Sequence, residues 1–287
     1  MNDSLIRCFE DTIRRCGSTE LKAAVERSIG SSVVYREGFI SRYFVPVSDA
    51  DLSDGHTAGA ETDISVESTT TLAAAARYRT LGRTAVLNFA NPEVPGGGVR
   101  NGAVAQEESL CRCSSLYPCL AAPEVFDDFY GYHFMHGRFL YSDRVIYTPG
   151  VIVFKDDALN LMDRSLWYKV DVLTCAAPLT ARLQCDTMML AELFRLRIKN
   201  ILNVALENRA EVLILGAFGC GAFRNPPEIV AGAFREVIEE GQYRRFFKKI
   251  VFAIKSSTDD PLRPCPNLTA FGEAKKAQTE KADKSVI

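Results

Sequence analysis

The sequence predicts a layered α/β domain whose sheet is parallel or mixed. From residue 68 onward, short apolar stretches typical of buried strands alternate with longer stretches whose apolar residues recur at helical spacing. Because the helices lie between the strands, neighbouring strands can pair in parallel through helical crossovers, as in α/β folds. We expect this core to span residues 68–256.

Each element of the expected core follows from its local sequence. The first helix, 68–82, opens on hydroxyl residues suited to cap it and stops at Gly82, and the buried strand 83–90 then leads directly into a glycine-rich loop. Pro149 and Gly150 are expected to break 145–154 into two short strands. The other expected elements are helices 106–121, 185–209 and 226–240 and strands 168–178, 211–219 and 247–254.

The segments outside the core differ from it in composition. Residues 1–67 are expected to form an amino-terminal extension packed on the core: it starts with helical periodicity, passes through an ambiguous extended stretch at 33–47, and reaches an exposed loop at 48–63. Residues 257–287 are expected to form a polar carboxy-terminal tail, and its lysine-rich end, residues 273–287, is expected to fray because it has almost nothing to bury. The helical periodicity of the extension is carried by Leu5, Ile6, Phe9, Ile13, Leu21, Val25 and Ile29.

Charge and cysteine content exclude several classes of protein. The 34 basic and 36 acidic residues leave a net charge of -2, so no global field draws the chain to nucleic acid or to a membrane, and we expect no stable nucleic-acid partner. The first residues mix charges among the apolar positions, which is unlike a signal peptide, and no stretch is long and apolar enough to span a bilayer. The 9 irregularly spaced cysteines favour reduced thiols and a cytoplasmic location.

The first glycine-rich loop, 88–110, contains Gly96, Gly97 and Gly98 and is followed by Glu107 and Glu108. A loop that holds nucleotide phosphates usually supplies a lysine, and this one has none. Two interpretations remain open. The acids can stabilise the start of a helix through its dipole, or one can act as a general acid whose pKa is raised by burial beside bound phosphate. Because adjacent helical side chains point about 100° apart, they are expected to do different work.

The second glycine-rich loop, 215–230, follows an apolar strand and contains Gly216, Gly219 and Gly221. Asn225, followed by two prolines, is suited to start the next helix. Such a backbone can hold a diphosphate through its N–H groups without a lysine, although a tight turn with small residues for packing explains the glycines equally well. Phe218 and Phe223 favour the first interpretation, because aromatic rings in such a loop can cover a ribose or a base.

Other candidate residues are better explained by packing or solvation. Cys111, Cys113 and Cys119 make a poor tetrahedral set without a matching pair or a nearby histidine, so no metal is expected. His133 and His136 have no partner pattern for nucleophilic catalysis. Arg77, Arg79 and Arg83 near a helix end are expected to be solvated charges rather than a phosphate site.

The two loops and their neighbours resemble microbial poly(ADP-ribose) glycohydrolases. The resemblance covers residues 68–255 and rests on the ordered motifs LNFANPEVPGGG, GGGVRNGAVAQEE, VIYTPGVIVFKD, VLTCAAP and LGAFGCGAFRNPPEIVAGAF. It implies a macrodomain, a three-layer α/β/α fold with a mixed sheet that binds ADP-ribose, here with an amino-terminal extension. It also implies that no cofactor or metal takes part.

The resemblance implies a role for each matching residue. Glu108 would protonate the leaving ribose oxygen and then activate water, and Glu107 would hold the neighbouring ribose. Gln106 would support the catalytic loop, and Asn91 would bind the hydroxyls of the distal ribose. The remaining residues would hold ADP-ribose: Gly96, Gly97 and Gly98 near the distal ribose and diphosphate, Gly219, Cys220, Gly221 and Ala222 around the diphosphate, and Phe223 over the distal ribose.

The expected activity is hydrolysis of the ribose–ribose bonds of poly(ADP-ribose), which releases ADP-ribose. The expected partners are therefore ADP-ribose, its polymer and ADP-ribosylated macromolecules. Two alternatives remain open: removal of single ADP-ribose units from a protein or nucleic-acid acceptor, and binding of ADP-ribose without turnover. A dinucleotide oxidoreductase is disfavoured, because neither loop follows Gly-x-Gly-x-x-Gly with an acid at the required distance.

Overall fold

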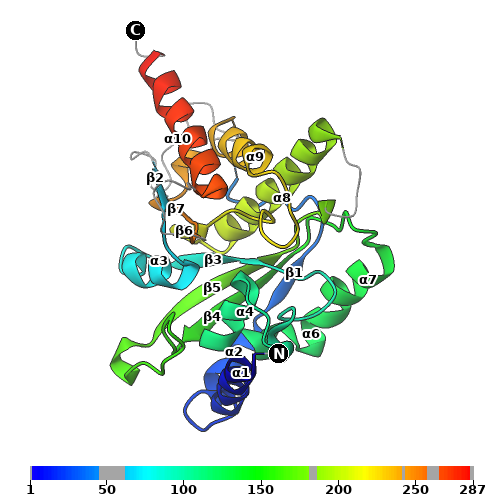
Figure 1. Cartoon of the computed structure of the whole chain (residues 1–287), viewed down its shortest axis with the longest axis vertical. Helices are drawn as coiled ribbons and strands as arrows, with labels where there is room; N and C mark the ends of the chain where they lie inside the picture. The colour runs from blue at the N-terminus through cyan, green and yellow to red at the C-terminus, as the bar shows by residue number, and fades with distance from the viewer. Residues whose placement is uncertain (1, 45–61, 181–185, 241–242, 257–264, 285–287) are drawn as a thin grey trace.

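The protein is built on one 7-stranded mixed sheet in the order β1-β4-β5-β3-β6-β7-β2 (Figure 1). Its structure, a computed structural model, describes residues 2–44, 62–180, 186–240, 243–256 and 265–284. β4 pairs antiparallel with both β1 and β5, and the other neighbours pair in parallel. The strands are β1 (Val33–Tyr35), β2 (Asp63–Glu67), β3 (Thr84–Phe89), β4 (Val145–Val153), β5 (Tyr168–Cys175), β6 (Val212–Leu215) and β7 (Lys249–Ala253).

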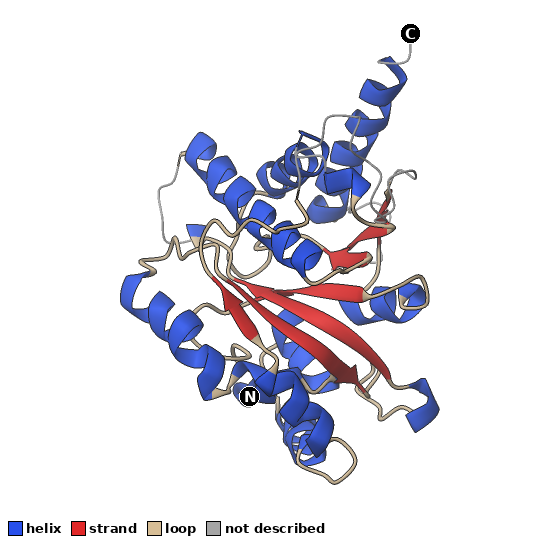
Figure 2. Ribbon diagram, turned by 180° about the vertical axis from the view of Figure 1, so that it is seen from behind, coloured by secondary structure: helices blue, strands red, loops and turns tan. Residues whose placement is uncertain are grey.

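Helices cover both faces of this sheet, so the predicted three-layer α/β/α fold is confirmed (Figure 2). One face carries α8 (Thr187–Glu207), α9 (Pro227–Glu240) and α10 (Pro266–Lys284). The other carries α1 (Asp3–Cys16), α3 (Thr71–Tyr78), α4 (Gln106–Cys113) and α5 (Leu116–Leu120). The other helical segments are α2 (Lys22–Gly30), η1 (Val99–Asn101), α6 (Pro123–Val125), η2 (Phe126–Gly131), α7 (Tyr132–His136), η3 (Arg164–Leu166) and η5 (Tyr243–Arg245).

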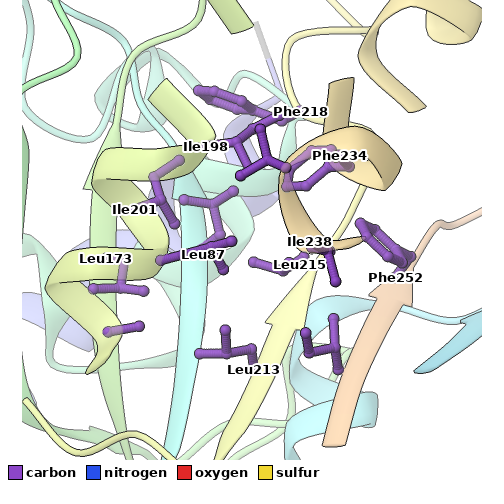
Figure 3. Close-up of a cluster of buried hydrophobic side chains, with 14 of the residues drawn as sticks. Leu87, Leu173, Ile198, Ile201, Leu213, Leu215, Phe218, Phe234, Ile238 and Phe252 are labelled. Carbon is purple, nitrogen blue, oxygen red and sulfur yellow. The ribbon is translucent and has the colours of Figure 1, made fainter. Parts of the chain in front are cut away.

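The central strands are buried on both faces. In β3, Leu87 points into the cluster under α8 and α9, which Figure 3 shows, whereas Val86 belongs to the cluster on the opposite face. In Figure 3, Leu87 and Leu215 lie opposite Ile198 of α8 and Phe234 of α9. This double burial explains why Ala85, Val86 and Leu87 follow one another without polar residues alternating between them.

Two local predictions need correction. The expected helix 106–121 is divided into α4 and α5, because Ser114 adopts an extended backbone and forms a β-bridge with Val153. The expected break in 145–154 does not occur: β4 continues through Pro149 and Gly150, and only its register against β5 shifts there. Gly150 takes a positive φ of 67°, which absorbs the irregularity without ending the strand.

The segment before residue 68 is part of the sheet and does not only pack on the core. It supplies β1 and β2, which are the two edge strands of the sheet, and the expected helical periodicity corresponds to α1 and α2. α1 is anchored by Lys155, whose ammonium donates to Cys8 O at 2.9 Å and Thr12 Oγ1 at 2.8 Å and pairs with Asp11 at 2.9 Å. Most of the expected loop 48–63 lies outside the described residues, and Asp63 begins β2.

The predicted polar tail, residues 257–287, contains the helix α10. α10 packs against α9 and β2. Phe271 is 2% exposed and lies 5.1 Å from the ring of Phe252 and 6.1 Å from that of Phe234. The polar composition of the last residues conceals this single aromatic anchor. Among the described residues, no helix is both long and apolar enough to cross a bilayer.

We expect Phe271→Ala to lower the free energy of unfolding by about 3 kcal/mol, because it removes a buried ring from a packed cluster. Urea unfolding at 25 °C measures the change. Glu273→Ala, on an exposed position of the same helix, is the matched control. A change within about 0.5 kcal/mol for Phe271→Ala, the range of an ordinary surface substitution, would show that α10 does not stabilise the sheet.

Candidate active site

The two glycine-rich loops lie side by side at one edge of the sheet. The first loop (residues 90–105) follows β3 and the second (residues 216–226) follows β6; because β3 and β6 are parallel neighbours, their carboxyl ends meet there. The ring of Phe89, at the end of β3, lies 5.8 Å from that of Phe218 in the second loop. A Cβ added at Gly216 would stand 2.9 Å from Phe89 Cζ, which shows how closely the loops approach.

Three successive side chains at the start of α4 each hold a different part of the segment from Phe89 to Gly98. Gln106 Oε1 accepts a hydrogen bond from Phe89 N at 3.0 Å, Glu107 Oε2 from Asn91 N at 2.7 Å, and Glu108 Oε1 from Gly98 N at 2.9 Å. The turn of about 100° per residue directs the three side chains apart. The loop is therefore held at its beginning, near Asn91 and at the end of the glycine run.

Gln106 also joins α4 to neighbouring elements. Its amide nitrogen donates to Leu87 O at 2.7 Å and to Thr71 Oγ1 at 3.1 Å. The start of α4 is thereby tied to β3 and to α3. This position fits the supporting role that the sequence resemblance implied for Gln106.

The glycine run is required because the two carboxylates occupy the space beside it. Gly97 has a φ of 57°, and a Cβ there would lie 2.6 Å from Glu108 Oε1 and 3.1 Å from Glu107 Oε2. In the hydrogen bonds described above, the acids accept from the loop rather than from the first turn of α4. Glu107 and Glu108 therefore bind the backbone of the first loop, which the alternative in which they only cap the helix does not explain.

Glu107 is a buried acid with no cation among the contacts described. It is 3% exposed, and burial raises its pKa to about 8; the neighbouring charge of Glu108 also raises it, while hydrogen bonds from Asn91 N and the Asn88 amide lower it. Asn88 Nδ2 lies 3.2 Å from Glu107 Oε1. Burial therefore favours the protonated form of the Glu107 carboxyl group near neutral pH.

Asn88 is a site residue that the sequence analysis missed. Its side chain is fully buried, and Asn88 Oδ1 has no hydrogen-bond partner. A polar residue inside the otherwise apolar strand β3 was the available signal in the sequence.

Asn91 shapes the first loop through its side chain. Its Oδ1 accepts from Glu93 N at 2.9 Å and from Val94 N at 2.8 Å, which folds the chain into a turn before the glycines. Its contact with a ribose stays a prediction.

The second loop is held at its base and open at its tip. Asn225 is buried, and its amide nitrogen donates to Gly219 O and to Pro178 O, both at 2.9 Å. Gly219 has a φ of 76°, and a Cβ there would lie 2.5 Å from Ala177 Cβ. Gly221, in contrast, has nothing within 4 Å of an added Cβ, and Gly221 and Ala222 are exposed. The tip thus has room for an anion beside its backbone.

The two phenylalanines of the second loop differ in position. Phe218 is 1% exposed and packs against Phe89 and against Phe194, whose ring lies 5.9 Å away. The expectation that Phe218 covers a ribose or base is therefore wrong, whereas Phe223 is half-buried at the edge of the core. Burial raises the pKa of Cys220 to about 12, so its thiol stays neutral.

The three cysteines and His133 belong to the packing of the fold. Cys111, Cys113 and Cys119 are buried in the described core. His133 is also buried, contacts Ser142 Oγ at 2.9 Å, and has a pKa lowered to about 4, first by burial and then by the charges of Arg197 and Arg144. In the ranges that the structure describes, no three His, Cys, Asp or Glu side chains are grouped as a metal ion would require.

The arrangement combines two functions at one sheet edge. Open backbone N–H groups of the second loop can bind an anion. Buried carboxyl groups under the first loop can donate a proton and position a hydroxyl group. A ligand with both a phosphate and a sugar would engage both loops.

Comparison with known proteins adds three findings. The family described as microbial-type PARG, catalytic domain, matches residues 10–156. The structure of poly(ADP-ribose) glycohydrolase from Thermomonospora curvata is similar, with 31% sequence identity and a TM-score of 0.83, and the match covers 95% of this chain and 100% of that one. The structure of the same enzyme with the inhibitor ADP-HPD has 30% identity and a TM-score of 0.81, and the match covers 95% of this chain and 99% of that one. The structure of the enzyme from Deinococcus radiodurans in complex with ADP-ribose has 32% sequence identity and a TM-score of 0.72, and the match covers 88% of this chain and 97% of that one. No curated protein matches the sequence.

We expect the stability of the protein to fall as the pH rises, through Glu107. The folded-state pKa of about 8 exceeds the ordinary value of 4.5, so the stabilising neutral form is complete below about pH 4.5 and is lost as the pH rises through 8. Relative to Glu107→Gln, the wild type should lose up to about 1.4 kcal/mol for each pH unit in this window. Urea unfolding at several pH values measures the difference.

Glu124→Gln, which removes an exposed glutamate, controls for the loss of one carboxyl group from the unfolded chain. Its pH dependence should parallel that of the wild type. Parallel curves for the wild type and Glu107→Gln would contradict the raised pKa.

Proposed function

Because the chain belongs to the microbial-type poly(ADP-ribose) glycohydrolase family, we propose that it hydrolyses the ribose–ribose glycosidic bonds of poly(ADP-ribose) and releases ADP-ribose. The protein is thus a glycosidase-type hydrolase. The observation that carries the proposal is the placement of Glu107 and Glu108 under the glycine run, beside a second loop with an open backbone tip.

In this proposal Glu108 acts first as an acid and then as a base. Its proton goes to the ribose oxygen that leaves, the glycosidic C–O bond breaks, and positive charge develops on the other ribose as an oxocarbenium-like centre. The Glu108 carboxylate then takes a proton from water as the water oxygen bonds to the anomeric carbon. Glu108 thereby regains its proton, and one water is consumed for each bond broken.

Glu107 holds the ribose next to the cleaved bond. Its neutral carboxyl group can donate a hydrogen bond to a ribose hydroxyl, which a carboxylate cannot do. Asn91 N already occupies one of its oxygens at 2.7 Å, so the orientation of the group is set before substrate arrives. An ordinary second catalytic carboxylate is not needed if a substrate phosphate helps to position the water.

The two loops hold the ADP-ribose portion of the substrate. The diphosphate lies against the backbone of Gly219, Cys220, Gly221 and Ala222, since successive N–H groups bind anions without a lysine. The distal ribose lies between the glycine run and Phe223, and Asn91 contacts its hydroxyls. Gln106 keeps the first loop in place through Phe89 N and Leu87 O.

The partners and the location follow from this chemistry. The substrates are poly(ADP-ribose) and the ADP-ribosylated macromolecules that carry it, and the product is ADP-ribose. Free buried thiols such as Cys111 and Cys175 suit a reducing compartment, so the cytoplasm is the proposed location. A protein that only binds ADP-ribose gains nothing from two acids beside phosphate, which argues against the binding-only alternative.

We expect Glu108→Gln to bind ADP-ribose as the wild type does and to lose about 10³-fold in turnover, because general acid catalysis supplies 10²–10⁴. Calorimetry measures the binding. Release of ADP-ribose is measured from labelled polymer and from a mono-ADP-ribosylated protein, with Glu124→Gln as the control.

The same assay on the wild type distinguishes polymer hydrolysis from removal of single ADP-ribose units and from binding without turnover. Release from the single-unit substrate alone would identify a mono-ADP-ribosyl hydrolase, and binding without any release would identify a binding protein. Full turnover by Glu108→Gln would remove Glu108 from the mechanism.

We expect Gly97→Ala to fold and to lose about 10²-fold in activity. The new methyl group would overlap Glu108 Oε1, 2.6 Å away, and displace the carboxyl group by about 1 Å, a shift that costs this much in rate. Gly232→Ala in α9, where an added Cβ meets nothing within 4 Å, is the control. Wild-type kcat in Gly97→Ala would show that the Glu108 carboxyl group is free to adjust.

A further inference from the structure

Tyr117 of α5 lies against the backbone of the glycine run. A Cβ added at Gly96 would stand 2.7 Å from Tyr117 Cδ2 and 3.1 Å from Cε2, so the ring contacts this glycine directly. Gly96 has a φ of 69°, which leaves no room for adjustment by another residue type. The ring of Tyr117 is therefore one wall of the space in which the run sits.

Two residues hold Tyr117 itself. Phe9 of α1 meets the ring at 4.8 Å between centroids and 80° between planes, an edge-to-face contact. Arg100 donates from Nε to the Tyr117 hydroxyl at 2.8 Å, and its guanidinium carbon lies 5.1 Å from the Tyr117 ring centroid and 5.9 Å from that of Phe9. We call Phe9, Arg100 and Tyr117 the aromatic clamp.

The clamp contacts the start of the glycine run through Tyr117 and is joined to its end through the chain at Arg100. Tyr117 packs on Gly96, and Arg100 belongs to η1, which follows Gly98 directly. The hydrogen bond between Arg100 and Tyr117 therefore closes a loop of contacts around Gly97 and Gly98. Gly98 N is the donor to Glu108 Oε1 at 2.9 Å.

We propose that the aromatic clamp is a positioning device for catalysis: it fixes the glycine run so that Gly98 N holds the Glu108 carboxyl group in its working orientation. The inference rests on the proposed function of Glu108. A hydrogen bond of this length weakens steeply when its donor shifts, and a displacement of about 1 Å at a catalytic group lowers rates by up to about 10²-fold. None of the three residues carries the reacting atoms.

Arg100 can be truncated without leaving a cavity in the core, because its side chain lies at the surface. Arg100 is exposed and borders a cavity of about 320 Å³. The cavity is lined by Ile6, Phe9, Glu10, Ile13, Arg14 and Arg100. Truncation of Arg100 extends this open space, so the fold should survive it. Tyr117→Phe keeps the ring on Gly96 and removes only the hydroxyl acceptor.

The test compares Arg100→Ala, Tyr117→Phe and the double variant with the wild type. We expect kcat on poly(ADP-ribose) to fall about tenfold in each single variant and no further in the double variant, because both remove the same hydrogen bond. KM and the Kd for ADP-ribose should stay within about twofold of the wild type. Arg100→Lys, which keeps a cation and a donor, should recover part of kcat.

Arg7→Ala is the matched control, since it removes another exposed arginine, from α1 and outside the clamp. Its kcat should equal that of the wild type. A binding stoichiometry near one for ADP-ribose in every variant shows that the protein is folded. Wild-type kcat in both single variants, or a loss carried by KM and Kd alone, would overturn the proposal.

Hydrogen exchange of the backbone provides a readout independent of activity. We expect the amides of residues 96–101 to exchange faster in Arg100→Ala than in the wild type, because the glycine run opens more often. A wild type that does not cleave polymer would refute the proposed function, while exchange would still test the clamp. Unchanged exchange in Arg100→Ala would refute the clamp itself.

Discussion

The site depends on one steric constraint: the Glu108 carboxyl group occupies the space that a side chain at Gly97 would need. The loop can pass over the acids only as bare backbone, and its N–H groups then become the donors that hold them. Gly98 N and Asn91 N bind Glu108 and Glu107, and Phe89 N binds Gln106. The absence of side chains in the glycine run therefore both makes room for the acids and lets the backbone hold them.

The rest of the fold keeps this loop in place. β3 and β6 are parallel neighbours in the middle of the sheet, so both glycine-rich loops leave the same edge. Both faces of these strands are buried, which makes the edge a rigid base. Phe218 fills the space between the loops by packing on Phe89, and Asn225 ties the second loop to the end of β5 through Pro178 O.

Burial of an acid without a cation is costly, and the structure shows what offsets it. Glu107 receives hydrogen bonds from Asn91 N and Asn88, yet its pKa remains about 8. Burial therefore favours the neutral form of this carboxyl group, and the proposal gives that form the hydrogen bond to a sugar hydroxyl. Carboxyl groups whose pKa is raised by burial are common at sites of acid and base chemistry.

The sequence by itself determined the order of the core strands and the two loops, because periodicity and glycines are local signals, and its ordered motifs carried the resemblance to the family. Tertiary structure alone decided which residues meet. It drew β1 and β2 from the extension into the sheet, anchored α10 through Phe271, and buried Phe218 while leaving Phe223 half-buried. It also placed Asn88 beside Glu107 and Phe9 beside Tyr117. The physical reason is that pairing and burial depend on residues far apart in the chain, which no local pattern records.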